Sequence, residues 1–92
     1  MKIDVVYLTT CPYCINARKA FEALAAEDPA YAGVEINWIE ESTLTAFPGW
    51  ADYYYVPTVF FHEKKLYEAQ PGQDYDTIKA CLKQALDTVL RK

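Results

Sequence analysis

Apolar residues along the chain follow two different periods, which separate strand segments from helical ones. Short, nearly continuous runs of β-branched and aromatic residues are typical of buried strands, whereas apolar residues that recur every three or four positions are typical of helices. The expected apolar face of the first helix consists of Cys14, Ala17, Phe21, Leu24 and Ala25. The pattern predicts, in order, a strand at 2–8, a helix at 15–26, a strand at 34–40, a short helix from about 43, and strands at 58–62 and 66–70. A last helix follows, with Asp74 or Asp76 as its N-cap.

Turn-forming residues mark the ends of these elements. Asp28-Pro29 ends the first helix, Glu63-Lys64-Lys65 is expected to form a hairpin turn, and Pro71-Gly72 turns the chain before the last helix. The apolar stripe of that helix is Ile78, Cys81, Leu82, Ala85, Val89 and Leu90. A strand–helix–strand start implies a right-handed crossover and a parallel pair of strands, and the closing hairpin makes the sheet mixed. We therefore predict an α/β protein with a four-stranded mixed sheet flanked by three helices, in the order βαβαββα.

Length and charge limit the classes of function. The 92 residues form one domain, 1–92, in which 52% of residues are apolar. The net charge of −4 argues against a nucleic-acid or anionic-membrane partner. Asp4 interrupts the first apolar run, which is too short for a signal peptide, and no run approaches the ~20 apolar residues of a membrane span. We expect a cytoplasmic monomer.

Two of the three cysteines lie three positions apart in Cys11-Pro12-Tyr13-Cys14, between the first strand and the first helix. Two thiols at such a turn can exchange electrons with a disulfide, for which the thiolate is the nucleophile. The unpaired N–H groups and the dipole at a helix N-terminus favour an anion at Cys11. We therefore expect Cys11 to attack and form a mixed disulfide. Cys14 lies one helical turn further in, and would then attack Cys11 and release the reduced product.

Zinc binding and simple packing are the alternatives for this cysteine pair. Zinc needs about four ligands, and only Cys81 and His62 remain, without the spacing of a second pair. We expect no metal. Cys81 is interpreted as a buried core thiol, with a regulatory disulfide as its alternative, and His62 as a solvated residue at a strand end.

Val56-Pro57-Thr58 is a second notable stretch, because proline rarely opens a central strand. A cis peptide would resolve this and would leave the backbone of Val56 free to pair with an extended substrate. An ordinary trans proline at a strand start is the alternative, and the periodicity leaves both open.

Together these features resemble the glutaredoxin branch of the thioredoxin superfamily over essentially the whole chain. The resemblance rests on the Cys-Pro-Tyr-Cys tetrad at 11–14, on Val56-Pro57-Thr58 before the third strand, and on Gly72 with Asp74 before the last helix. The tetrad is specific to dithiol glutaredoxins, whereas the other features are shared with thioredoxins. The resemblance implies a thioredoxin fold, disulfide oxidoreductase activity, and a cis Pro57 that lies against the active disulfide.

The resemblance also implies a substrate site. In glutaredoxins the cysteinyl part of glutathione pairs with the residue that matches Val56, and its γ-glutamyl end meets the residues that match Gly72 to Asp74. The implied substrate-binding set is Pro12, Tyr13, Val56, Pro57, Thr58, Gly72 and Asp74. The family commonly has a lysine that binds the glycyl carboxylate where this chain has Leu8. No arginine or lysine lies between residues 42 and 56 to replace it. Protein disulfides and glutathione mixed disulfides are therefore both candidate substrates, with glutathione or another thiol as reductant and no bound cofactor.

The sequence also leaves two alternative functions to compare with disulfide exchange. A non-catalytic binding module would use the aromatic surface around Trp50 and Tyr53 to Tyr55, although these side chains, with Phe47, are more often core and wall. Iron–sulfur carriage through Cys11 and glutathione is disfavoured because Pro12 stiffens the loop and Cys14 competes as a thiol. Trp38 is interpreted as core.

Overall fold

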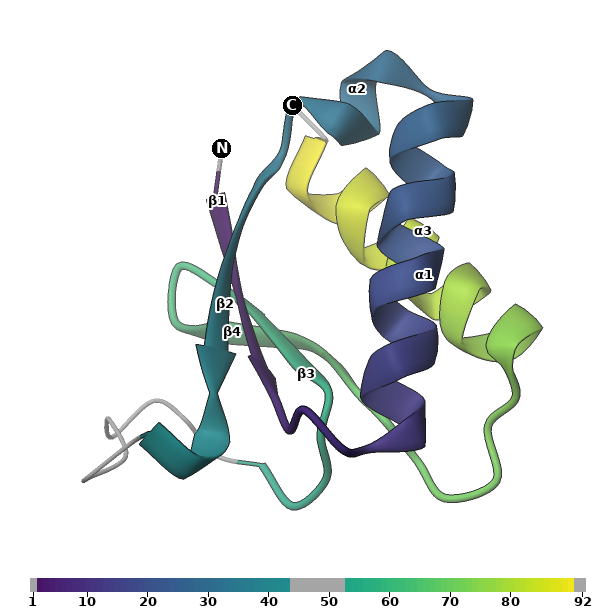
Figure 1. The fold of residues 1–92 in the computed structure, drawn as a ribbon. Helices are drawn as coiled ribbons and strands as arrows, with labels where there is room; N and C mark the ends of the chain where they lie inside the picture. Colours follow the sequence, from purple (N-terminus) through teal and green to yellow (C-terminus); the bar gives the residue numbers. More distant parts are fainter. Residues whose placement is uncertain (1, 44–52, 91–92) are drawn as a thin grey trace.

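The computed structural model describes residues 2–43 and 53–90. Within these ranges the chain forms four strands in one sheet and three α-helices (Figure 1). The elements are β1 (Lys2–Tyr7), α1 (Pro12–Glu27), α2 (Pro29–Ala32), β2 (Glu35–Glu40), a 3-10 turn η1 (Glu41–Thr43), β3 (Thr58–Phe61), β4 (Lys64–Glu68) and α3 (Tyr75–Leu90).

The sheet is mixed, with strand order β2-β1-β3-β4. β1 pairs in parallel with β2 and antiparallel with β3, and β3 pairs antiparallel with β4. A parallel pair needs a crossover connection, which α1 supplies. The predicted α/β class and four-stranded mixed sheet are confirmed.

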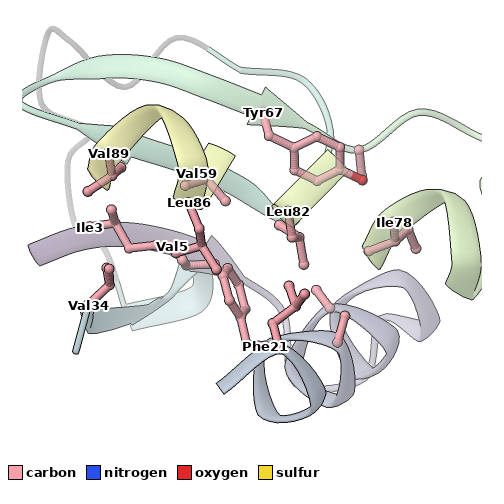
Figure 2. Close-up of a cluster of buried hydrophobic side chains, with 14 residues drawn as sticks. Ile3, Val5, Phe21, Val34, Val59, Tyr67, Ile78, Leu82, Leu86 and Val89 are labelled. Atoms are coloured by element: carbon pink, nitrogen blue, oxygen red, sulfur yellow. The ribbon is translucent and has the colours of Figure 1, made fainter. Parts of the chain in front are cut away.

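Helices α1 and α3 pack side by side on one face of the sheet (Figure 1). The core between them and the sheet contains Ile3, Val5 and Val59 from the strands and Phe21 from α1, and α3 adds an apolar stripe (Figure 2). The buried residues of that stripe are Ile78, Leu82, Ala85, Leu86 and Val89. Removing each large side chain from water contributes about 1.5–3 kcal/mol, so this core fixes α1 firmly against β1.

The opposite face of the sheet is also buried at its centre. Val6, Thr58 and Phe60 are at most 1% exposed, and the ring of Tyr53 meets Phe60 edge-on. This explains why the apolar run of β1 is nearly continuous, as in strands covered on both faces.

The β3–β4 hairpin differs from the prediction. Its turn is the two-residue His62-Glu63, and both residues have positive φ, at 50° and 65°. Two residues in that conformation match the turn that joins twisted antiparallel strands most tightly. β4 therefore begins at Lys64 and ends at Glu68, so the predicted strand at 66–70 lies two residues too far along the chain. The predicted turn at 63–65 starts one residue too late and ends two residues too late.

Helix boundaries also differ. α1 begins at Pro12, three residues before the periodic stretch from Ile15 by which it was recognised. Asp28, which ends α1, caps the short α2 with its carboxylate on the N–H of Ala30. The sequence pattern did not predict α2. The helix expected from about residue 43 falls on residues 44–52, outside the described part of the chain.

None of the helices formed by residues 2–43 and 53–90 combines the length and apolar content that a membrane span requires.

Candidate functional site

The turn from β1 into α1 positions both thiols. Cys11 is the N-cap of α1 and has an extended backbone, with φ −77° and ψ 123°. Its N–H donates to the Leu8 carbonyl at 3.2 Å, and its own carbonyl accepts from Ile15 at 3.1 Å. Pro12 follows at the first helical position, where no N–H is needed. The two cysteines thus lie on either side of the first helical turn, and both are free thiols.

The environments of the two thiols differ as the sequence predicted. Cys11 is half-buried, whereas Cys14 is 4% exposed. The Cys14 sulfur accepts the N–H of Leu8 at 3.4 Å. The pKa of Cys14 is raised to about 12, first because the thiol is buried and then because of the neighbouring Cys11 and the charge of Glu41; the Leu8 N–H opposes this shift. Cys14 is therefore held as a protonated thiol at neutral pH.

The Cys11 sulfur is directed at the backbone before Pro57. Its thiol donates to the Val56 carbonyl at 3.7 Å, and the side chain makes no capping hydrogen bond to α1. In the thiol form the sulfur therefore bonds to the Val56 backbone and not to the first N–H groups of the helix, and the preference of this helix end for an anion at Cys11 stays a prediction. Loss of the proton would remove the bond to Val56, while the first-turn N–H groups without intrahelical partners remain at this end of α1.

The Val56–Pro57 peptide bond is cis, so the trans alternative is wrong. The Pro57 carbonyl accepts the N–H of Ala69 at 3.0 Å, and the Thr58 hydroxyl donates to the Tyr55 carbonyl. The N–H of Val56 makes no backbone hydrogen bond with any residue in the described ranges. This backbone segment is thus fixed beside Cys11.

Tyr13 connects the dithiol turn to the loop before α3. Its hydroxyl oxygen accepts the N–H of Gly72 at 2.8 Å. Gly72 has φ +89°, a conformation that favours glycine. Asp74 caps α3 by accepting the N–H of Thr77 at 2.8 Å, and the Thr77 side chain and N–H lower the pKa of Asp74. The structure therefore brings Gly72 to Tyr13, while the carboxylate of Asp74 serves as the predicted helix cap.

Glu40 is a site residue that the sequence interpretation missed. Its carboxylate accepts the Thr9 hydroxyl at 2.8 Å and the N–H and hydroxyl of Ser42 at 2.8 and 2.9 Å. The Ser42 N–H, followed by the Thr9 and Ser42 hydroxyls, lowers the pKa of Glu40. The contact between Glu40 and Thr9 could have been inferred from the expected parallel pairing of β1 and β2, because that pairing places Glu40 at the end of β2 opposite Tyr7. Through Thr9, it ties the loop before Cys11 to η1.

The tyrosines before Pro57 are not core residues. Tyr54 is 88% exposed and Tyr55 is 48% exposed, so the expectation of core and wall is wrong for both. Tyr53 is half-buried; its hydroxyl donates to Glu41 at 2.6 Å, and burial followed by this contact raises its pKa. Phe47 and Trp50 lie outside the described residues.

Three lesser residues can be compared with their predictions. His62 is exposed, as predicted, but it lies in the β3–β4 turn and not at the end of the strand. Cys81 is only half-buried at the edge of the core, so the fully buried thiol is a partial error. Trp38 packs edge-on against Tyr7 and Phe21 and is half-buried, with the Arg18 guanidinium 4.3 Å from its ring centre.

Beside the buried thiol, an open groove of about 500 Å³ is lined in part by Leu8, Cys14 and Ile15, and Ile15 is 46% exposed. Among residues 2–43 and 53–90, no three His, Cys, Asp or Glu side chains are grouped so that they could hold a metal ion.

Comparison of the chain with models of known protein families and with curated proteins gives no match.

Proposed function

We propose that this protein is a thiol–disulfide oxidoreductase of the thioredoxin fold, similar to the dithiol glutaredoxins. The observation that carries the proposal is the asymmetry of the dithiol: a half-buried Cys11 beside the Val56 carbonyl, with a buried, protonated Cys14 one helical turn behind it. An accessible attacking thiol and a protected resolving thiol are what two-step disulfide exchange requires.

In the first step the Cys11 thiolate attacks one sulfur of the client disulfide. The client S–S bond breaks, one client sulfur leaves as a thiolate and takes a proton, and Cys11 carries the mixed disulfide. In the second step Cys14 loses its proton and attacks the Cys11 sulfur, and the second client sulfur leaves and is protonated. The client gains two electrons and two protons, and the protein holds a Cys11–Cys14 disulfide, which an upstream thiol must reduce.

The first step prepares the second. Two causes of the raised pKa of Cys14 are its hydrogen bond with Cys11 and the charge of Cys11. Both disappear when the Cys11 sulfur enters the mixed disulfide, while the Leu8 N–H still stabilises a Cys14 thiolate. Cys14 therefore becomes easier to ionise at the stage when it must attack.

Among clients, the charge distribution favours protein disulfides over glutathione mixed disulfides. Residues 20–61 contain no lysine, arginine or histidine, and Leu8 replaces the family's lysine. The Gly72 N–H already donates to Tyr13. An anionic tripeptide would thus find fewer charge-assisted contacts than in a typical glutaredoxin, whereas a protein client can bind along the backbone of Val56.

Replacing the resolving thiol tests the proposal. Cys14→Ser should accumulate a mixed disulfide with a disulfide-bearing protein, and peptide mapping by mass spectrometry should locate it at Cys11. Cys81→Ser is the matched control and should turn over without accumulating an adduct. An adduct that forms at Cys81, or none at all, would overturn the assignment.

The exposed Tyr54 and Tyr55 favour a second candidate, a non-catalytic binding module. It predicts no turnover of any disulfide and no difference in reactivity between Cys11 and Cys81. The rate of thiol alkylation as a function of pH separates the two candidates.

A further inference from the structure

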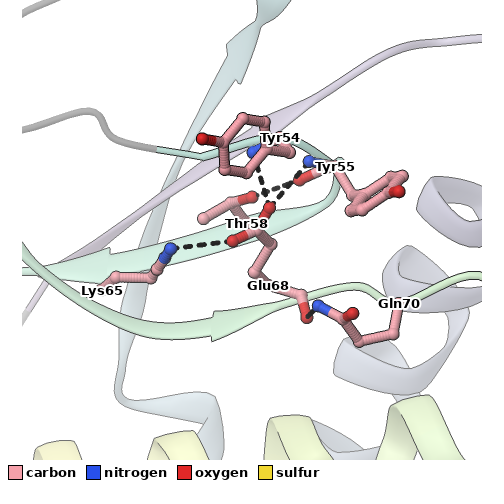
Figure 3. Close-up of polar contacts among 6 residues, drawn as sticks. All are labelled: Tyr54, Tyr55, Thr58, Lys65, Glu68 and Gln70. Carbon is pink, nitrogen blue, oxygen red and sulfur yellow. Dashed lines mark hydrogen bonds and ion pairs between the residues drawn. The ribbon is translucent and has the colours of Figure 1, made fainter.

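Glu68, the last residue of β4, accepts hydrogen bonds from two successive backbone N–H groups of the segment before Pro57. One carboxylate oxygen accepts Tyr54 at 2.6 Å and Tyr55 at 2.8 Å, and the other pairs with the Lys65 ammonium at 2.8 Å (Figure 3). The Glu68 side chain is 11% exposed. We call Glu68, Lys65 and the two N–H groups the Glu68 clamp.

The hairpin is built so that both charged residues reach this place. Residues three apart in a regular strand point to opposite faces of the sheet. The β3–β4 register pairs Val59 with Tyr67 and Phe60 with Lys65, so β4 has one extra residue, Leu66. This bulge reverses the alternation and turns Lys65 to the same face as Glu68. The face is the one opposite α1 and α3, since Glu68 pairs with the buried Thr58.

A buried carboxylate is costly unless charge and hydrogen bonds compensate it, and here three contacts do so. The clamp does not serve to bury the two tyrosine side chains, because both Tyr54 and Tyr55 are exposed. What the contacts fix is the backbone. The clamp holds the N–H side of Tyr55, and the Thr58 hydroxyl holds its carbonyl.

The fixed backbone leads directly to the dithiol. Val56 follows Tyr55, and its carbonyl lies 3.7 Å from the Cys11 sulfur. On the far side, the Pro57 carbonyl accepts Ala69, the residue after Glu68. The end of β4 thus contacts the segment on both sides of Val56.

We propose that Glu68 is a positioning residue for client binding: through the N–H groups of Tyr54 and Tyr55 it holds Val56 in the place where a client backbone pairs beside Cys11. This inference rests on the proposed function. It requires that Glu68 matter for clients with a peptide backbone and not for small disulfides, which react at Cys11 without needing Val56.

The test compares two probes in single-turnover reduction by the fully reduced protein. One is a short synthetic peptide whose only cysteine is blocked as a mixed disulfide with 2-nitro-5-thiobenzoate, and the other is bis(2-hydroxyethyl) disulfide. Glu68→Gln keeps the shape but removes the charge. We expect it to lower the second-order rate constant for the peptide by roughly 10-fold, mainly through a higher half-saturating peptide concentration, as for one lost charge-assisted hydrogen bond. The rate with the small disulfide should stay unchanged. Glu63→Gln, an exposed change on the same hairpin, is the matched control and should alter neither rate.

An equal loss with both probes would show a merely structural role and overturn the inference, as would an unchanged peptide rate. A wild-type protein that reduces neither probe would instead refute the proposed function. Should Glu68→Gln not fold, the wild-type protein still provides a test by NMR. Its Tyr54 and Tyr55 amide protons should be protected from exchange and should shift together as Glu68 is protonated; amides that exchange freely and do not respond to acid would overturn the inference.

Discussion

Alkylation of the three thiols provides a direct measure of the asymmetry on which the proposed chemistry depends. We expect iodoacetamide to modify Cys11 readily in the folded, reduced protein, and Cys14 very slowly. Cys14 is 4% exposed and its pKa is raised from 9.0 to about 12, chiefly because it is buried. Only the thiolate reacts, so the rate follows the ionised fraction.

The size of the effect follows from those two values. At pH 8 a thiol of ordinary acidity is ionised in roughly one molecule in ten, and a thiol with the pKa of folded Cys14 in roughly one in 10,000. Unfolding should therefore accelerate alkylation of Cys14 by about 1,000-fold, before any steric protection is added. Cys81, which is half-buried and not part of the dithiol, should change far less.

The assay is site-resolved mass spectrometry of initial rates, with and without guanidinium chloride. Initial rates are needed because modification of Cys11 removes part of what suppresses ionisation of Cys14. A Cys14 rate within about tenfold of its unfolded rate, or a folded Cys14 that reacts faster than Cys11, would refute the reasoning.

Two further predictions concern the scaffold that positions the site. Leu82→Ala deletes a fully buried side chain of α3 and should lower the free energy of unfolding in urea by about 2–5 kcal/mol, whereas the exposed Gln84→Ala should change it little; equal effects would show that the α3 stripe is not the core. Asp74 caps α3 and has a folded pKa below its usual 3.8, so its stabilisation is present above that value and is lost as pH falls through the lower folded pKa. Wild-type protein should therefore lose more stability between about pH 5 and pH 2 than Asp74→Asn, which keeps a cap that does not titrate; parallel pH curves would contradict this.

The succession of strands along the chain, the parallel first pair and the central core were predictable because they follow from period and chain order. The β-branched run of β1 and the spacing of Phe21 and Leu24 require buried faces whatever their partners are. The dithiol was predictable for a similar local reason: Cys11 and Cys14 lie where a strand meets a helix that begins with proline.

Features that depend on contacts between distant residues were not predictable. The Glu68 clamp requires the bulge at Leu66 and the tight turn at His62-Glu63, and neither follows from local pattern. The exposure of Tyr54 and Tyr55 was missed for the same reason, since aromatic residues near a strand usually pack inward and here a carboxylate fixes their backbone from beneath.

Under the proposed function, the hydrogen bond between Tyr13 and Gly72 would affect which substrates the protein selects. A backbone N–H that already has a good acceptor offers little to an incoming carboxylate, which must first displace the phenol. At this corner the protein would discriminate against small anions by having its donor occupied, which is separate from the absence of a lysine at position 8 for the other end of a glutathione ligand. Tyr13 would then compete for the Gly72 N–H with the γ-glutamyl end of glutathione, which glutaredoxins bind at the matching position.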